Sequence, residues 1–167
     1  MSQTVPSLFR SVAAAAVLVA GLLAGPDAVR AQAHGPYVDV SAYISSDEDI
    51  DAWYGMTWQL RRDFDDICGD TFCEGEYTNI ESLRFQFSVH RVSGRLGMCV
   101  WSFAASDEVV DPASGKVVVR PRTWQCRAPI GAGTTLEELL AAVGEQSPLY
   151  APLPGGRSVF EGLVDCL

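Results

Sequence analysis

The sequence predicts an α+β fold, with a long N-terminal helix packed on a three-stranded antiparallel meander and two short C-terminal helices. Three observations predict this fold. Between residues 47 and 67 apolar side chains recur every three to four positions, as in an amphipathic helix. Between residues 83 and 127 the hydrophobic period falls to two, as in half-buried strands, and beyond Pro129 helical spacing returns. Helices and strands segregated in this order are typical of the α+β class.

The first 33 residues have the pattern of a secretory signal peptide. Arg10 precedes an apolar run from Ser11 to Gly25, and Ala31-Gln32-Ala33 has the small-x-small form of a cleavage site. The apolar run is too short and too early for a membrane span. We therefore expect a periplasmic or secreted protein that begins at His34 and forms one disulfide-stapled domain over residues 34–167, a length that suits a single core.

The mature chain is strongly acidic. Removal of Arg10, Asp27 and Arg30 from the 12 basic and 21 acidic residues leaves 10 and 20, a net charge of -10. Such a charge argues against nucleic-acid binding, which depends on basic contacts to phosphates. All five cysteines lie in the mature part, where an oxidising compartment would let them pair.

The long helix is expected over residues 47–67, ending near Gly69. Ser45-x-x-Glu48 has the form of a capping box, and the acidic first turn suits the positive end of the helix dipole. The apolar stripe comprises Ile50, Trp53, Tyr54, Leu60, Phe64 and Ile67.

Strands are expected over residues 83–89, 96–104 and 116–127, and the turns between them predict the register. A three-residue loop at Val92-Ser93-Gly94, with Gly94 in the left-handed region, pairs Phe87 with Cys99, Phe85 with Trp101 and Leu83 with Phe103. A turn with Pro112 at its second position pairs Trp101 with Trp124 and Cys99 with Cys126. The sequence therefore predicts a Cys99–Cys126 disulfide.

Two short helices are expected after Pro129. Thr134 or Thr135 caps the first, whose apolar residues are Leu136, Leu139, Leu140 and Val143, and Gly144 ends it. After a loop over residues 148–156, Ser158-x-x-Glu161 predicts a second capping box. The last helix is expected to turn Phe160, Leu163, Val164 and Leu167 inward.

Cys68 and Cys73, four residues apart just after the long helix, enclose Gly69, Asp70, Thr71 and Phe72. They are expected to pair with each other or with another cysteine such as Cys166. This spacing, the strand-turn-strand that follows and the acidic balance resemble the inhibitors of vertebrate lysozyme. The resemblance implies that the loop enters a target enzyme, although the histidine-bearing loop of that family is absent here. A pre-fixed loop suits binding because it loses less entropy.

Residues 70–81 partly match a calcium-binding loop. The oxygen ligands would come from Asp70, Glu74, Glu76, Thr78 and Glu81, with Gly75 at the turn. Phe72 stands where an oxygen ligand is wanted, and a strand rather than a helix follows. The alternative interpretation is a solvated acidic turn.

The expected N-terminus, His34-Gly35, is similar to the start of some bacterial lytic polysaccharide monooxygenases. That resemblance implies a copper ion held by the His34 amine and ring, and His90 is the only further histidine.

The sequence offers little for hydrolysis. It has no Gly-x-Ser-x-Gly motif for a serine nucleophile. The carboxylates of residues 63–70 are interpreted as the solvent-exposed face of the helix. Three tryptophans, at positions 53, 101 and 124, are expected in the core. Trp58 lies off the stripe and is predicted to contact a partner.

We therefore expect an exported binding protein without catalytic activity or stable membrane insertion. An inhibitor or immunity-type protein that engages a cationic partner, with its acidic surface and its cysteine-pinned loop, is the most concrete form of this hypothesis. The alternatives are a calcium- or copper-binding secreted protein and a structural domain with no dedicated ligand.

Overall fold

The computed structural model describes residues 35–73, 75, 77–144 and 146–167. The expected signal peptide, its cleavage site and His34 lie outside these residues. The strands are β1 (Tyr37–Asp39), β2 (Glu81–His90), β3 (Leu96–Val110) and β4 (Val117–Arg127), and the helices are α1 (Asp47–Ile67), α2 (Leu136–Val143) and α3 (Val159–Val164). A 3₁₀ turn (Val40–Ala42) follows β1, and one π-helical turn (Cys68–Phe72) follows α1.

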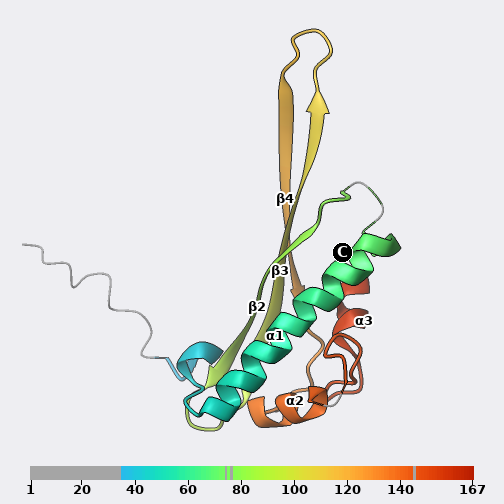
Figure 1. Cartoon of the computed structure of the whole chain (residues 1–167). Helices are drawn as coiled ribbons and strands as arrows, with labels where there is room; N and C mark the ends of the chain where they lie inside the picture. Colours follow the sequence, from blue (N-terminus) through green and yellow to red (C-terminus); the bar gives the residue numbers. More distant parts are fainter. Residues whose placement is uncertain (1–34, 74, 76, 145) are drawn as a thin grey trace, which may run out of the picture. The chain divides into compact units, whose positions relative to one another are not determined.

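The three helices lie against one face of a four-stranded antiparallel sheet, which confirms the α+β prediction (Figure 1). The strand order is β1-β2-β3-β4, so a short strand, β1, joins the three expected strands. The core lies between this sheet face and the helices. Its largest fully buried side chains include Trp101, Phe64, Phe87 and Phe103.

Helix α1 has the predicted bounds, but its cap lies one residue later than expected. Ser46, not Ser45, accepts a hydrogen bond from the Asp49 amide, and the Ser46 hydroxyl donates to the Asp49 carboxylate at 2.7 Å. The buried stripe comprises Trp53, Met56, Leu60 and Phe64. Tyr54 was wrongly assigned to this stripe: the turn of the helix rotates it onto an exposed flank.

The β2–β3 hairpin confirms part of the predicted register. Phe87 pairs with Cys99 and Phe85 with Trp101, and Gly94 has a left-handed φ of 67°. The predicted pairing of Leu83 with Phe103 is wrong, because an irregularity between Ser82 and Arg84 puts Ser82 opposite Phe103. The Leu83 side chain is consequently exposed.

The β3–β4 turn is longer than predicted. The Asp111 amide donates to the Lys116 carbonyl at 2.8 Å, and Gly115 has a left-handed φ of 67°, so four residues form the loop. The loop is held by the Asp111 carboxylate, which accepts from the amides of Ala113 and Ser114 at 2.8 and 3.0 Å. The longer loop shifts each partner along β4 by two residues.

The shift overturns two predictions. Trp124 lies opposite Phe103 rather than Trp101, and Cys126 lies opposite Trp101 rather than Cys99. The Cys99–Cys126 disulfide is therefore absent, and Cys99 is a buried free thiol. Trp124 is only half-buried, at the edge of the core.

Two disulfides staple the chain. Cys68 is bonded to Cys73, the first of the two pairings that the sequence left open, and Cys126 is bonded to Cys166. The second bond joins α3 to β4. Gly162 lets α3 approach closely, since a Cβ there would lie 2.9 Å from Pro129 Cδ. Two disulfides are typical of an oxidising, extracytoplasmic compartment.

The short helices have the predicted caps. Thr135 forms a capping box with Glu138, and Ser158 forms one with Glu161. The prediction for α3 is wrong at Val164, which is exposed, because Val159 and Leu163 form the buried side of this single turn and a half. No helix in the described part of the chain combines the length and the apolar character needed to cross a membrane.

Candidate binding site

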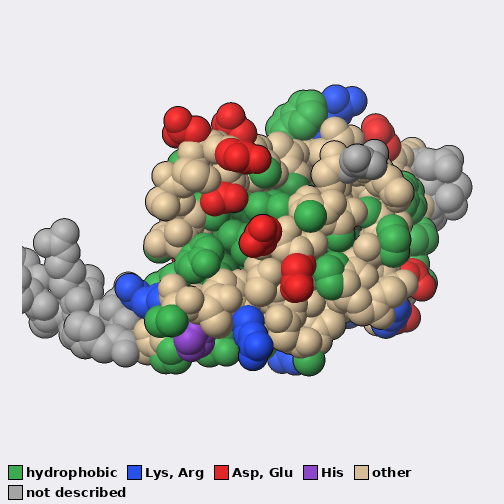
Figure 2. All heavy atoms as spheres, turned by 90° about the horizontal axis from the view of Figure 1, so that it is seen from below, with side chains coloured by type: hydrophobic (Ala, Val, Ile, Leu, Met, Phe, Trp, Pro, Cys, Tyr) green, Lys and Arg blue, Asp and Glu red, His purple; other side chains and the backbone are tan. Residues whose placement is uncertain are grey.

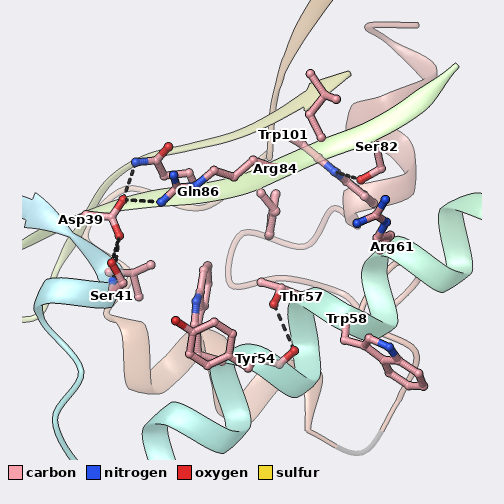
Figure 3. A pocket seen from close by; sticks show the side chains of 14 residues that line it. Asp39, Ser41, Tyr54, Thr57, Trp58, Arg61, Ser82, Arg84, Gln86 and Trp101 are labelled. Atoms are coloured by element: carbon pink, nitrogen blue, oxygen red, sulfur yellow. Dashed lines mark hydrogen bonds and ion pairs between the residues drawn. The ribbon is translucent and has the colours of Figure 1, made fainter. Parts of the chain in front are cut away.

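A groove of about 570 Å³ lies between α1 and β2 (Figure 3). Thr57 and Arg61 of α1 line one side, and residues 82–86 of β2 line the other. The 3₁₀ turn, with Val40 and Ser41, closes one end, and Trp101 contributes to the floor. We call this feature the α1–β2 groove.

The groove exists because β1 is short. β1 pairs with β2 only from His90 to Ser88, its own last paired residue being Asp39. The chain then turns inward, since Val40 is buried in the core and begins the 3₁₀ turn. Within the described residues, no strand pairs with residues 81–87 on this side of β2. This stretch is therefore an open sheet edge.

Asp39 organises the closed end of the groove. Its carboxylate accepts hydrogen bonds from the amide and hydroxyl of Ser41, at 2.9 and 2.6 Å, and from the side-chain amide of Gln86. The Arg84 guanidinium lies 3.4 Å away. Burial raises the pKa of Asp39, but the hydrogen bonds from Ser41 and Gln86 and the attraction of Arg84 together bring this pKa below its ordinary value.

The floor is held by a buried hydrogen bond. The Trp101 indole N–H donates to the Ser82 hydroxyl at 2.8 Å, and both residues are almost fully buried. Trp101 also packs against Phe64, Phe85 and Phe103 at centroid separations of 5.6, 5.4 and 4.9 Å. A satisfied polar group among packed rings makes a rigid floor.

Exposed apolar side chains stand around the groove. Tyr54, Trp58 and Leu83 are 56%, 58% and 57% exposed. The Trp58 ring lies at the helix rim, where the Arg62 guanidinium stands 4.8 Å above its centroid. Leu83 faces outward because of the irregularity in β2, and such irregularities often redirect a side chain at a binding site.

The groove is basic in an acidic protein. Its charged lining consists of Arg61, Arg84 and Asp39, a net charge of +1, whereas the chain carries -9. Arg84 forms an ion pair with the Asp39 carboxylate, but Arg61 has no ion-pair partner among the described residues. The groove therefore presents one unneutralised guanidinium beside apolar surface.

Comparisons with protein-family models, curated proteins and solved structures find no match.

Trp58 lies away from the cysteine-pinned loop with which it was predicted to bind a partner. Trp58 and Cys68 are ten positions apart on one helical path, about 15 Å along its axis. Phe72, expected to contact a partner, packs inward on Phe160 with ring centroids 5.6 Å apart. Gly69 is exposed, and the side chains of Asp70 and Thr71 lie outside the described part. Trp58 therefore belongs to the α1–β2 groove and not to the cysteine-pinned loop.

The predicted metal sites lie largely outside the described side chains. Those of Asp70, Glu74 and Glu76 are not described, while Thr78 and Glu81 are exposed. Among the side chains that the structure describes, no group of three or more His, Cys, Asp or Glu residues is arranged to hold a metal ion.

His90, the predicted second copper ligand, has other contacts. Its Nδ1 lies 3.1 Å from the Ser93 hydroxyl, and its ring stacks edge-on against Tyr37 at 5.3 Å. The proposed first ligand, His34, lies outside the described residues.

Little of the groove follows from the sequence pattern. Leu83 and Arg84 fall in the strand expected over residues 83–89, Arg61 lies off the expected apolar stripe of the long helix, and Asp39 precedes the first expected element. One signal was present in the sequence, because Arg61 lies three residues after Trp58 and therefore on the same side of the helix.

Proposed function

We propose that this is an exported binding protein, periplasmic or secreted, that does not act as a catalyst and that holds its partner in the α1–β2 groove. The observation that carries the proposal is the combination, over a rigid floor, of exposed Tyr54, Trp58 and Leu83 with Arg61, which has no ion-pair partner in the described part of the chain. Aromatic and arginine side chains supply most binding energy at protein interfaces.

The chemistry of Asp39 supports binding rather than catalysis. A general acid or base works best when its pKa lies near the working pH. The pKa of Asp39 is instead lowered, and its oxygens already accept hydrogen bonds from Ser41 and Gln86. This carboxylate is suited to shaping the groove.

A second candidate is the inhibitor or immunity-type role that the sequence predicts, with a cationic partner on the acidic surface of α1. Six acidic residues of this helix are exposed and have no ion-pair partner among the described residues: Asp47, Glu48, Asp49, Asp51, Asp65 and Asp66. Figure 2 shows acidic side chains gathered at one end of the face seen from below. Opposite charge would accelerate association and make it salt-sensitive.

Capture from periplasmic extract and culture medium, with the purified oxidised protein as bait, tests both candidates. Two double variants are compared as bait: Arg61→Glu with Leu83→Ser in the groove, and Asp65→Asn with Asp66→Asn on the acidic surface. If only the groove variant loses the partner, the result supports binding in the groove. If only the acidic-surface variant loses the partner, the result overturns binding in the groove in favour of the acidic surface. All substituted positions are exposed, so unchanged melting temperatures serve as the control for folding.

Calcium and copper binding remain predictions, because most of the ligands expected for them lie among side chains that the structure does not describe. A metal that binds only the folded chain must raise its melting temperature. Melting curves with added calcium or copper therefore test these alternatives separately from the groove.

A further inference from the structure

We propose that the segment bound in the α1–β2 groove is an extended polypeptide strand that pairs with the open edge of β2 and places a carboxylate beside Arg61. This inference rests on the proposed function and specifies its partner. It combines two independent features in one groove: a sheet edge and a guanidinium that both lack a partner among the residues that the structure describes.

The first feature is the state of the two outer edges of the sheet. Open edges pair readily with other chains, and proteins often block them with proline or charge. The β4 edge is protected in this way, since Pro121 lacks an N–H and stands between Arg120 and Arg122. β2 has no proline, and its edge from residue 82 to residue 86 opens into the groove rather than to bare solvent.

The groove has the dimensions of a short strand. Residues 82–86 of β2 span about 17 Å at about 3.3 Å per residue. The short β1 already pairs antiparallel with Ser88–His90, so an added strand would continue the same edge where β1 leaves it. Alternate side chains of that strand would face the floor formed by Phe85 and Trp101, and main-chain pairing would supply affinity.

The second feature, charge, specifies the occupant. Arg61 lines the groove without an ion-pair partner among the described residues, although acidic residues outnumber basic ones by 21 to 12 in the whole chain. A guanidinium binds a carboxylate through two parallel hydrogen bonds. The net charge of +1 on the groove lining attracts a carboxylate, whereas the acidic residues of α1 repel one, so an acidic strand fits the groove.

The experiment uses a library of random peptides of about seven residues, enough to pair with residues 82–86 and leave one residue at each end. Peptides are selected on the oxidised protein, and selected sequences are resynthesised in three forms. One form carries N-methyl groups at odd positions, one at even positions, and one has Asp and Glu replaced by Asn and Gln. Amide hydrogen exchange of β2 is measured with and without the parent peptide.

The expected result is a shared acidic position and a loss of affinity of about tenfold or more in one N-methylated form only, because one set of alternate N–H groups faces the edge. Amides of residues 82–86 should exchange more slowly on binding. Arg61→Glu should weaken binding about tenfold or more, whereas the matched Arg91→Glu, on the distant hairpin loop, should not.

Three results would overturn strand addition. They are equal affinity of both N-methylated forms, unchanged exchange in β2, and failure of the library to yield any peptide whose binding depends on Arg61. A different result would overturn the proposed function: the groove variants would capture the natural partner as well as the unchanged protein does. If the groove variants lose that partner but amide exchange in β2 is unchanged on binding, the groove is the binding site and strand addition is wrong.

Discussion

Replacement of Cys166 by serine should destabilise the protein far more than replacement of Cys99 by alanine. Cys166 is bonded to Cys126 across a sequence separation of 40, and this bond joins α3 to the sheet. In the loop-entropy account, a crosslink of this length stabilises the folded chain by about 4 kcal/mol. For a domain of this size, that loss lowers the melting temperature by about 14 °C.

The matched control is Cys99→Ala. Cys99 is buried and forms no disulfide, so the substitution removes one sulfur atom from a packed site. The expected cost is about 1 kcal/mol, as for loss of a single buried methyl group. Burial also raises the pKa of the Cys99 thiol, which keeps it in the unreactive protonated form.

Urea unfolding of both variants without reductant measures the free energy of unfolding of each one. Thiol titration shows which cysteines are free and which form disulfides. The wild-type protein should show the Cys99 thiol only after denaturation. Equal costs for the two variants, or a peptide containing Cys99 linked to Cys126 in a non-reducing digest, would refute this reasoning. Either result would restore the pairing expected from the turn rules alone.

Three further predictions concern the core, the sheet edge and the groove. Phe64→Ala should cost about 3–5 kcal/mol in urea unfolding, because the ring is fully buried against Phe103 at 4.7 Å; a cost below about 1 kcal/mol would contradict this packing. Pro121→Val should increase aggregation measured by light scattering, since it restores a donor to the β4 edge, and an equally soluble variant would show that proline does not protect this edge. Because the pKa of Asp39 is lower in the folded chain than its ordinary value of 3.8, ionised Asp39 contributes to stability at pH values above 3.8. This contribution is lost as the pH falls through the pKa of the folded state. Asp39→Asn should therefore flatten the acid limb of stability against pH, and an unchanged limb would refute that contribution.

Helix boundaries were predictable because their signals are local. The bounds of α1 follow from a periodic apolar stripe, and both capping boxes of α2 and α3 depend on residues three positions apart. The cap of α1 was placed one residue early because Ser45 and Ser46 are adjacent and both precede acidic residues. Only backbone geometry selects Ser46.

The prediction of a Cys99–Cys126 disulfide was wrong because the loop between β3 and β4 is longer than expected. The parity of the β3–β4 register was correct, so the expected residues share a face, but four loop residues replaced the expected two. Side-chain alternation reveals the face of a strand and is unchanged by a shift of two residues. Alternation therefore could not detect the error, and Cys99 was given the partner that belongs to Trp101.

By itself the sequence determined the α+β class, the order and approximate extent of its elements, and the presence of enough cysteines for two crosslinks, because these depend on local periodicity, caps and counting. Tertiary structure alone decided that Cys126 meets Cys166, that β1 stops after three residues, and that Arg61 and the edge of β2 line one groove. Those features join segments distant in sequence, and their geometry depends on loop lengths and packing that no local pattern encodes.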